Sequence, residues 1–375
     1  MTSRPPVLSR LIKRLAGAPP PSVGAVAEDD AFFEDLTRTY ARCAQQVLDD
    51  NFDHDRYGEE ALAELSVRTA AFTTATLGSL MNEPRQWARA HDLFSDARSR
   101  RWFVDLVVYR LLGHRHVRLS RDDGRFRADC DLARAMGEDG AALSGGYGPA
   151  RRYRMAGTDG ESVVLDGWWF NIAWPFLIGQ YRLDRDAVRI AVEPGDRVID
   201  AGACFGDTTL AFADAAGSGG RVHAFEIIQE NLAVARHNLT LNPRFASTVC
   251  FSAEALGDRC GTLYVHGSGP GAIVSTAPSA EPVTVTTIDE YVRREALERV
   301  DFIKMDIEGS EAAALRGATD TLRRFRPKLA ISLYHRPEDL RQIPLWVDNL
   351  RLGYRLYLDH YTIHLEETVL YAVAD

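Results

Sequence analysis

Cysteine is scarce in this chain. The 375 residues include only five cysteines, and no two of them have the spacing Cys-x-x-Cys. They are Cys43, Cys130, Cys204, Cys250 and Cys260. A scattered set of odd number predicts neither a disulfide framework nor a cysteine zinc site. We therefore expect a reducing, cytoplasmic location.

Long apolar runs and a basic surplus are also missing. The strongest apolar stretch covers only residues 167–178, whereas a membrane-spanning helix needs about 20 residues. Lys and Arg number 44 against 53 Asp and Glu, which gives a net charge of -9. A nucleic-acid-binding protein usually carries a basic excess. The composition predicts no integral membrane segment and no nucleic-acid partner, and it leaves small molecules, glycans and proteins open as substrates.

The first half of the chain has mainly helical patterns. Residues 1–28 form a basic, proline-rich tail that we expect to be flexible. Apolar residues at helical spacing follow in residues 32–47, in residues 59–80 and after Ser95. Short strands are expected at residues 116–120 and 162–166. We assign residues 29–180 to an accessory region that shapes a substrate pocket or mediates homo-oligomer formation.

The second half alternates strand and helix patterns. Strands are expected at residues 197–202, 221–226, 247–253, 300–306 and 328–333, with a helix after each except the third. A β-hairpin with a glycine-rich turn is expected near residues 262–276. Residues 354–361 and 368–374 should form an antiparallel edge pair. The order predicts an α/β fold with a mostly parallel, Rossmann-like sheet covered by helices on both faces.

A ligand site is expected where the first two strands end, because open α/β sheets bind ligands at that edge. Gly202 and Gly206 let the backbone approach a ligand, and Asp207 and Thr208 open a helix whose free N–H groups face the site. Glu226 follows Gly206 by 20 residues (226 − 206) and can accept both hydroxyls of a ribose. Such glycines can also serve packing alone, but the combination with an acidic strand end predicts a nucleoside site.

Two residues bear on which nucleoside binds. Cys204 stands where the motif G-x-G-x-x-G has its second glycine, which disfavours the pyrophosphate of NAD. Asp200, at the end of the first strand, suits a cationic amino acid moiety better than a phosphate. These features argue against a dinucleotide.

Two blocks of sequence resemble a known family. Residues 195–213 (GDRVIDAGACFGDTTLAFA) and 219–243 resemble motif I and its successor in S-adenosylmethionine-dependent methyltransferases. Residues 300–340, which include KMDIEGSE, and the ending ETVLYA closely resemble the FkbM family. The resemblance covers about half of the chain and implies a class I methyltransferase domain at residues 181–375.

The resemblance also implies roles for particular residues. Asp200, Gly202, Ala203 and Gly206 should wrap the methionine part of S-adenosylmethionine. Glu226 should hold the ribose, and Ala253 and Glu254 should lie beside the adenine. The family further implies O-methylation of a hydroxyl on a sugar, a glycan, or a glycosylated or polyketide-type natural product.

Candidate catalytic residues follow the fourth and fifth strands. We predict that Asp306 or His335 is the general base and that Glu308 orients the substrate or its partner. The two carboxylates can instead cap the next helix, and His335 can bond only to backbone. Asp306, Glu308 and His335 also offer ligands for a divalent cation, although no spacing demands a metal.

Other interpretations remain open at this stage. An NAD-dependent oxidoreductase or epimerase would share the sheet and the acidic strand end. A non-catalytic module of a biosynthetic assembly would bind the cofactor without turnover. The aromatic residues Trp168, Trp169, Phe170 and Trp174 form either a lid or the apolar seam between two domains.

Overall fold

The computed structural model describes residues 26–49, 51–141, 144–145, 148–185, 188–266, 273–279 and 282–374. Most of the expected flexible tail, residues 1–25, therefore lies outside the described residues. The chain divides into two compact units, one of residues 1–122 and 333–368 and the other of residues 123–332 and 369–375. The domain boundary expected near residue 181 falls inside the second unit. Within the described segments, no helix has the length and apolar character needed to cross a membrane.

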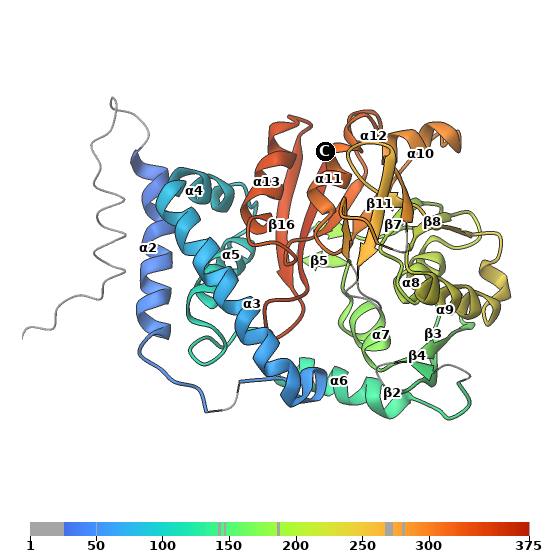
Figure 1. Cartoon of the computed structure of the whole chain (residues 1–375), viewed down its shortest axis with the longest axis horizontal. Coiled ribbons are helices and arrows are strands. Elements are labelled where there is room, and N and C mark those ends of the chain that lie inside the picture. The colour runs from blue at the N-terminus through green and yellow to red at the C-terminus, as the bar shows by residue number, and fades with distance from the viewer. Residues whose placement is uncertain are drawn as a thin grey trace, which may run out of the picture. The chain divides into compact units, whose positions relative to one another are not determined.

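The first unit is mainly helical (Figure 1). Its elements are α2 (Val26–Cys43), α3 (His54–Asn82), α4 (Pro84–Asp92), α5 (Ala97–Leu112), α13 (Asp339–Asn349) and β16 (Tyr354–His360). Helix α2 packs on α4 and α5, α4 packs on α13, and α5 packs on β16. Asp96 caps α5 by accepting a hydrogen bond of 2.6 Å from the backbone N–H of Ser99. The three helical patterns of the sequence are thus confirmed.

The strand expected at residues 116–120 is wrong. The backbone N–H groups of His116 and Val117 both donate to the carbonyl oxygen of Gly113, at 3.2 and 3.1 Å. Gly113 itself has a φ of 74°, which ends α5 and reverses the chain. A tight turn therefore consumes the donors that a strand would have offered to a neighbour.

The second unit begins with one helix and several small sheets. Its first elements are α6 (Gly124–Met136), β1 (Ser144–Gly145), β2 (Gly148–Pro149), β3 (Arg151–Ala156), β4 (Ser162–Gly167), α7 (Phe170–Ile172), a π-helical segment (Ala173–Ile178), β5 (Leu183–Arg185) and β6 (Val188–Ile190). Strands β3 and β4 pair antiparallel, which confirms the strand expected at residues 162–166. The hairpin tip is fastened to helix α8 (Asp207–Ala216), since Thr158 donates its backbone N–H to Asp214 over 2.8 Å.

The main sheet has the strand order β16-β17-β15-β14-β7-β8-β9. Its strands, in addition to β16, are β7 (Arg197–Ala201), β8 (Arg221–Phe225), β9 (Val249–Ser252), β14 (Phe302–Met305), β15 (Lys328–Ser332) and β17 (Thr368–Ala374). The five strands from β15 to β9 pair in parallel, and β17 pairs antiparallel with β15. Helices α8, α9 (Gln229–Thr240), α11 (Glu311–Arg316) and α12 (Thr319–Phe325) connect them. The predicted mostly parallel sheet is confirmed.

A smaller sheet is inserted between β9 and β14. It has the order β10-β13-β11-β12, with β10 (Ala255–Leu256), β11 (Gly261–His266), β12 (Ile273–Ser275) and β13 (Pro282–Thr286). Strands β11 and β12 pair antiparallel, as expected for the hairpin, while its turn at residues 267–272 lies outside the described residues. A 3₁₀ turn (Pro243–Phe245) precedes β9, and α10 (Ile288–Arg294) leads back toward the main sheet.

Candidate active site

The loop after β7 is held in a conformation that glycine makes accessible. Gly202 and Gly206 have φ angles of 85° and 82°. The backbone N–H groups of Gly202 and Ala203 both donate to the carbonyl oxygen of Phe225 at the end of β8, over 3.0 and 2.9 Å. Cys204 also lies in the left-handed region, with φ 47°, which explains why glycine is common in such loops. The loop is thus drawn against the neighbouring strand.

Asp200 is an internal anchor of this loop. Its side chain is fully buried and accepts hydrogen bonds from the hydroxyls of Thr208 and Thr209, over 3.0 and 2.6 Å. The ammonium of Lys304 lies 3.1 Å from its other oxygen and also donates to the carbonyl oxygen of Gly202. Asp200 therefore stabilises the loop from the interior of the protein. Its expected role in binding the methionine part of the cofactor stays a prediction.

Two buried charges near the loop depend on each other. Burial alone would lower the pKa of Lys304, but the carboxylates of Asp200, Asp306 and Asp207 together raise it above its ordinary value. Burial raises the pKa of Asp207 to about 6, against a hydrogen bond of 3.1 Å from the Asn171 amide and the charge of Lys304. Lys304 is thus the cation that allows several carboxylates to gather here.

Glu226 is oriented by the backbone on both sides. One carboxylate oxygen accepts the N–H of Ile228 at 2.7 Å, and the other accepts the N–H of Cys204 at 2.9 Å. Burial raises the pKa of this carboxyl above its ordinary value, and these two hydrogen bonds act in the opposite direction. The Asn231 side chain also hydrogen-bonds to this carboxylate, so Glu226 is fixed in direction before any hydroxyl binds to it.

Ala253 and Glu254 follow β9 directly, as predicted. Ala253 is exposed, and Glu254 pairs with the guanidinium of Arg294 over 2.5 and 2.9 Å. The hydrogen bonds from Arg294 lower the pKa of Glu254. The Glu254 carboxylate is therefore tied toward α10, and the backbone and the exposed Ala253 are left as the parts of this segment that can lie beside an adenine.

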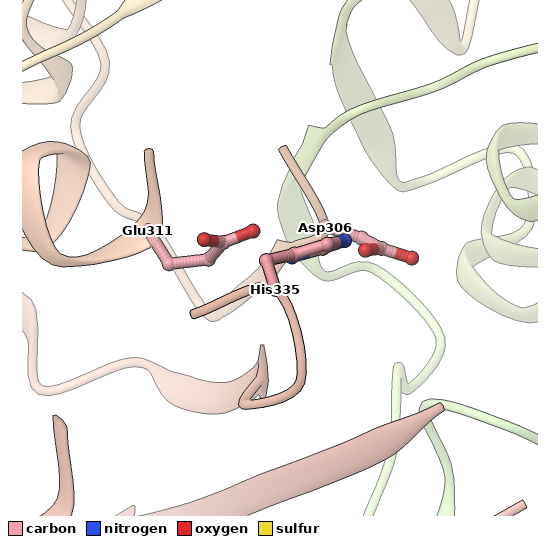
Figure 2. A group of neighbouring side chains, drawn as sticks. All are labelled: Asp306, Glu311 and His335. Carbon is pink, nitrogen blue, oxygen red and sulfur yellow. The ribbon is translucent and has the colours of Figure 1, made fainter. Parts of the chain in front are cut away.

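The carboxylates after β14 occupy a sharp loop. Glu308 and Gly309 both have positive φ angles, 51° and 92°. Glu311 is fully buried, and its carboxylate accepts the N–H of Ile307 over 2.8 Å. Figure 2 shows the side chains of Asp306 and Glu311, and an oxygen of one lies within 4.8 Å of an oxygen of the other. The structure thus brings the Glu311 carboxylate close to that of Asp306, and the role of Glu308 stays a prediction.

His335 follows β15 by three residues and belongs to the first unit. There the buried guanidinium of Arg110 donates to the carbonyl oxygens of Leu333 and Pro337, over 3.2 and 2.8 Å. These two carbonyls flank His335 in the chain, and the Tyr334 ring lies 4.1 Å from its imidazole, centroid to centroid. The histidine segment is therefore held by α5, and the pairing of His335 with Asp306 or Glu308 stays a prediction.

The aromatic segment lies against the cofactor-type loop of its own unit. The ring of Trp168 is 4.9 Å from that of Phe205, which belongs to the loop, and is stacked on Phe170 at 6.2 Å. Asn171 accepts the N–H of Trp168 and donates to Asp207. The role of this segment as a domain seam or a lid stays a prediction.

Sequence reasoning missed four residues at this site, namely Lys304, Tyr181, Asn171 and Glu311. Lys304 could have been identified from the sequence, because a lysine inside a strand that is expected to be buried needs an acidic partner. Tyr181, whose hydroxyl donates to Asp306 over 2.5 Å, lies outside every motif and had none. Asn171 was hidden in a segment that was interpreted through its aromatic residues.

A parallel sheet of this strand order, with a glycine loop and an acidic residue after its first two strands, defines the class I methyltransferase fold. Residues 200–356 match the model of the methyltransferase FkbM domain. The chain therefore carries an FkbM-family methyltransferase domain, as the resemblance had implied.

The chain is similar to several solved structures, of which one supports this fold. The chain is similar to the methyltransferase FkbM of Methylobacillus flagellatus KT, with 20% identity, a TM-score of 0.50, and coverage of 79% of this chain and 60% of that one. It is also similar to an S-adenosylmethionine-dependent O-methyltransferase from Thermotoga maritima, with 16% identity, a TM-score of 0.31, and coverage of 49% and 60%. The match thus spans about 60% of the length of each relative. No curated protein matches the chain significantly.

Proposed function

We propose that this chain is an S-adenosylmethionine-dependent O-methyltransferase. Its acceptor would be a hydroxyl of a sugar, a glycan, or a glycosylated or polyketide-type natural product. The family match supports methyl transfer in general. The choice of a hydroxyl acceptor rests on the resemblance to the FkbM family and on the carboxylates at the strand ends.

The observation that carries the cofactor assignment is the sign of the charge around the loop after β7. Asp200, Asp207, Glu226 and Asp306 lie on or beside this loop, and Lys304 is the cation paired among them. A net negative surrounding favours a cofactor with a sulfonium and an ammonium group and opposes the pyrophosphate of NAD. The left-handed Cys204 adds a side chain at the position where a pyrophosphate needs bare backbone.

The chain's own residues would then have separate tasks. Glu226, fixed by two backbone N–H groups, accepts the ribose hydroxyls, and the loop of residues 202–206 encloses the amino acid part. The bound cofactor supplies an activated methyl group and a thioether leaving group. Asp306 or His335 would accept the proton that the acceptor hydroxyl loses when it is methylated. Glu308 orients the acceptor.

Calorimetric titration tests this proposal. The full chain is titrated with S-adenosylhomocysteine and with NAD, and the titrations are repeated on Glu226→Gln and on Glu290→Gln. Glu290 is a carboxylate on α10 that pairs with Arg293, and it serves as the matched control. We expect binding of S-adenosylhomocysteine alone, weakened about 10- to 100-fold in Glu226→Gln by the loss of charge-assisted hydrogen bonds, and unchanged in Glu290→Gln.

Two other outcomes would point elsewhere. Binding of NAD in preference to S-adenosylhomocysteine would favour an oxidoreductase or epimerase. Binding of S-adenosylhomocysteine without transfer of a labelled methyl group to any member of a broad panel of sugars, glycosides and polyketides would favour a non-catalytic module.

A further inference from the structure

Tyr181 makes two contacts with charged groups of the candidate site. Its hydroxyl donates a hydrogen bond of 2.5 Å to Oδ2 of Asp306. The Lys304 ammonium lies over its ring, 5.2 Å from the centroid. The side chain is only 3% exposed, so both contacts are shielded from water. Tyr181 therefore joins the carboxylate after β14 to the cation that anchors the loop after β7.

The backbone at Tyr181 is held against its own preference. Its φ is 65°, a left-handed value that is rare for an aromatic residue. The segment before it is fixed by a π-helical turn, in which the carbonyl oxygen of Trp174 accepts the N–H groups of both Gly179 and Gln180. Residues kept in strained conformations by their surroundings are concentrated at functional sites. The strain and the contact with Asp306 are separate observations about one residue.

Asp306 lies beside the loop that the cofactor would occupy. Strands β14 and β7 pair in parallel with Met305 opposite Ala201, and the N–H of Asp306 donates to the Ala201 carbonyl over 3.0 Å. A β-carbon on Gly202 would lie 1.8 Å from the main-chain oxygen of Asp306. The two loops therefore leave the sheet in direct contact, and the carboxylate of Asp306 adds negative charge next to the expected place of the methionine part.

We propose that Tyr181 is a positioning residue that holds the ionised carboxylate of Asp306 toward the sulfonium centre of S-adenosylmethionine. This inference rests on the proposed function. A hydrogen bond to a carboxylate fixes its direction and favours its charged form. S-adenosylmethionine has a positive sulfur that S-adenosylhomocysteine lacks, so a fixed negative charge prefers the substrate to the product. Methyl transfer would then weaken the hold on the spent cofactor and assist its release.

The test compares the affinities for the two forms of the cofactor, and it needs no acceptor. Dissociation constants of S-adenosylmethionine and S-adenosylhomocysteine are measured by calorimetry on the full chain. The variants are Tyr181→Phe, Asp306→Asn and the double variant. Tyr291→Phe is the control, because Tyr291 is equally buried and its hydroxyl bonds to His223 instead.

We expect Asp306→Asn to reduce the preference for S-adenosylmethionine about tenfold. Tyr181→Phe should reduce it about three- to tenfold, with the affinity for S-adenosylhomocysteine nearly unchanged. The double variant should match Asp306→Asn, since Tyr181 acts through Asp306, and Tyr291→Phe should leave the preference as it is.

Equal weakening of both ligands by Tyr181→Phe would show that the tyrosine only stabilises the fold, and additive effects in the double variant would show that it acts apart from Asp306. Either result overturns the inference while leaving the proposed function intact. A parent chain that binds neither ligand would instead overturn the proposed function, and this inference with it.

Discussion

The main-chain oxygen of Asp306 lies 1.8 Å from the point where residue 202 would carry a β-carbon. Gly202 is therefore required twice, once by this contact and once by its φ of 85°. The loop after β7 and the loop after β14 are therefore in close backbone contact at this point. A change at Gly202 should consequently reach the candidate base as well as the cofactor loop.

We expect Gly202→Ala to lower the free energy of unfolding by at least about 2 kcal/mol, because the methyl group overlaps backbone and the left-handed φ is strained. Affinity for S-adenosylhomocysteine should fall by at least about tenfold. Cys204→Gly is the control in the same loop, since it relieves a φ of 47° and adds no atom; its stability should stay within about 1 kcal/mol of the parent. Retained affinity in Gly202→Ala would contradict the required contact.

Lys304 and Asp200 form a buried ion pair, with 1% and 0% of their side chains exposed. Lys304→Met leaves the Asp200 carboxylate without its cation and should lower the free energy of unfolding by about 3–5 kcal/mol. The double variant Lys304→Met/Asp200→Asn should recover part of this loss, because the amide still accepts from Thr208 and Thr209. Urea denaturation measures all three chains. A double variant no more stable than Lys304→Met alone would show that the carboxylate was not the source of the cost.

Asp207 gives a pH dependence with a definite sign. Its pKa is about 6 in the fold, against an ordinary value of 3.8. Between these values the folded chain retains a proton that the unfolded chain has released, so stability falls as the pH rises from about 4 to about 6. Asp207→Asn removes this effect and should gain up to about 3 kcal/mol on the parent over that range.

Urea denaturation of parent and variant at about pH 4 and pH 7 measures the gain. Comparison with the parent cancels the opposite contribution of His223, whose burial lowers its pKa to about 4. Asp320→Asn, which neutralises an aspartate with 86% of its side chain exposed, is the control. A constant difference between Asp207→Asn and the parent at both pH values would rule out the raised pKa.

Arg110 should control the order of the segment that carries His335. Arg110→Met removes both hydrogen bonds to the carbonyls of Leu333 and Pro337 and should cost about 2–3 kcal/mol. Hydrogen exchange should become faster around residues 333–337. The control is Arg89→Met in the same unit, where a half-exposed guanidinium pairs with Asp348 and should contribute less than about 1 kcal/mol. An unchanged rate of hydrogen exchange in Arg110→Met would show that the two Arg110 hydrogen bonds do not order this segment.

The succession of strands and helices in the second half, and the mostly parallel sheet, could be predicted because they depend on local patterns. Each parallel strand is a short apolar run with a helix beside it, and right-handed crossovers leave few ways to arrange such runs. The glycine loop and Glu226 were found for the same reason, since each lies directly after such a run. The site residues that directly follow these strands could therefore be identified from the sequence.

The partners of those residues could not be predicted in the same way. The contact of Tyr181 with Asp306 joins residues 125 positions apart and depends on a π-helical turn that has no sequence signature. The prediction for Asp200 did not include its ion pair with Lys304, because a single sequence does not show which charged residues pair in the fold. The division of the chain depends on residues 333–368 joining the N-terminal helices, a long-range association that composition does not reveal.

That return of the chain to its first unit sets a delay during synthesis. Helix α5 ends at Leu112, and the C-terminal part of the same unit begins only at residue 333, about 220 residues later. At a translation rate of about 5–20 residues per second, the apolar faces of α4 and α5 wait roughly 10–40 s for α13 and β16. The N-terminal helices therefore leave the ribosome before α13 and β16 can pack against them. During that interval we expect chaperones to bind their exposed apolar faces.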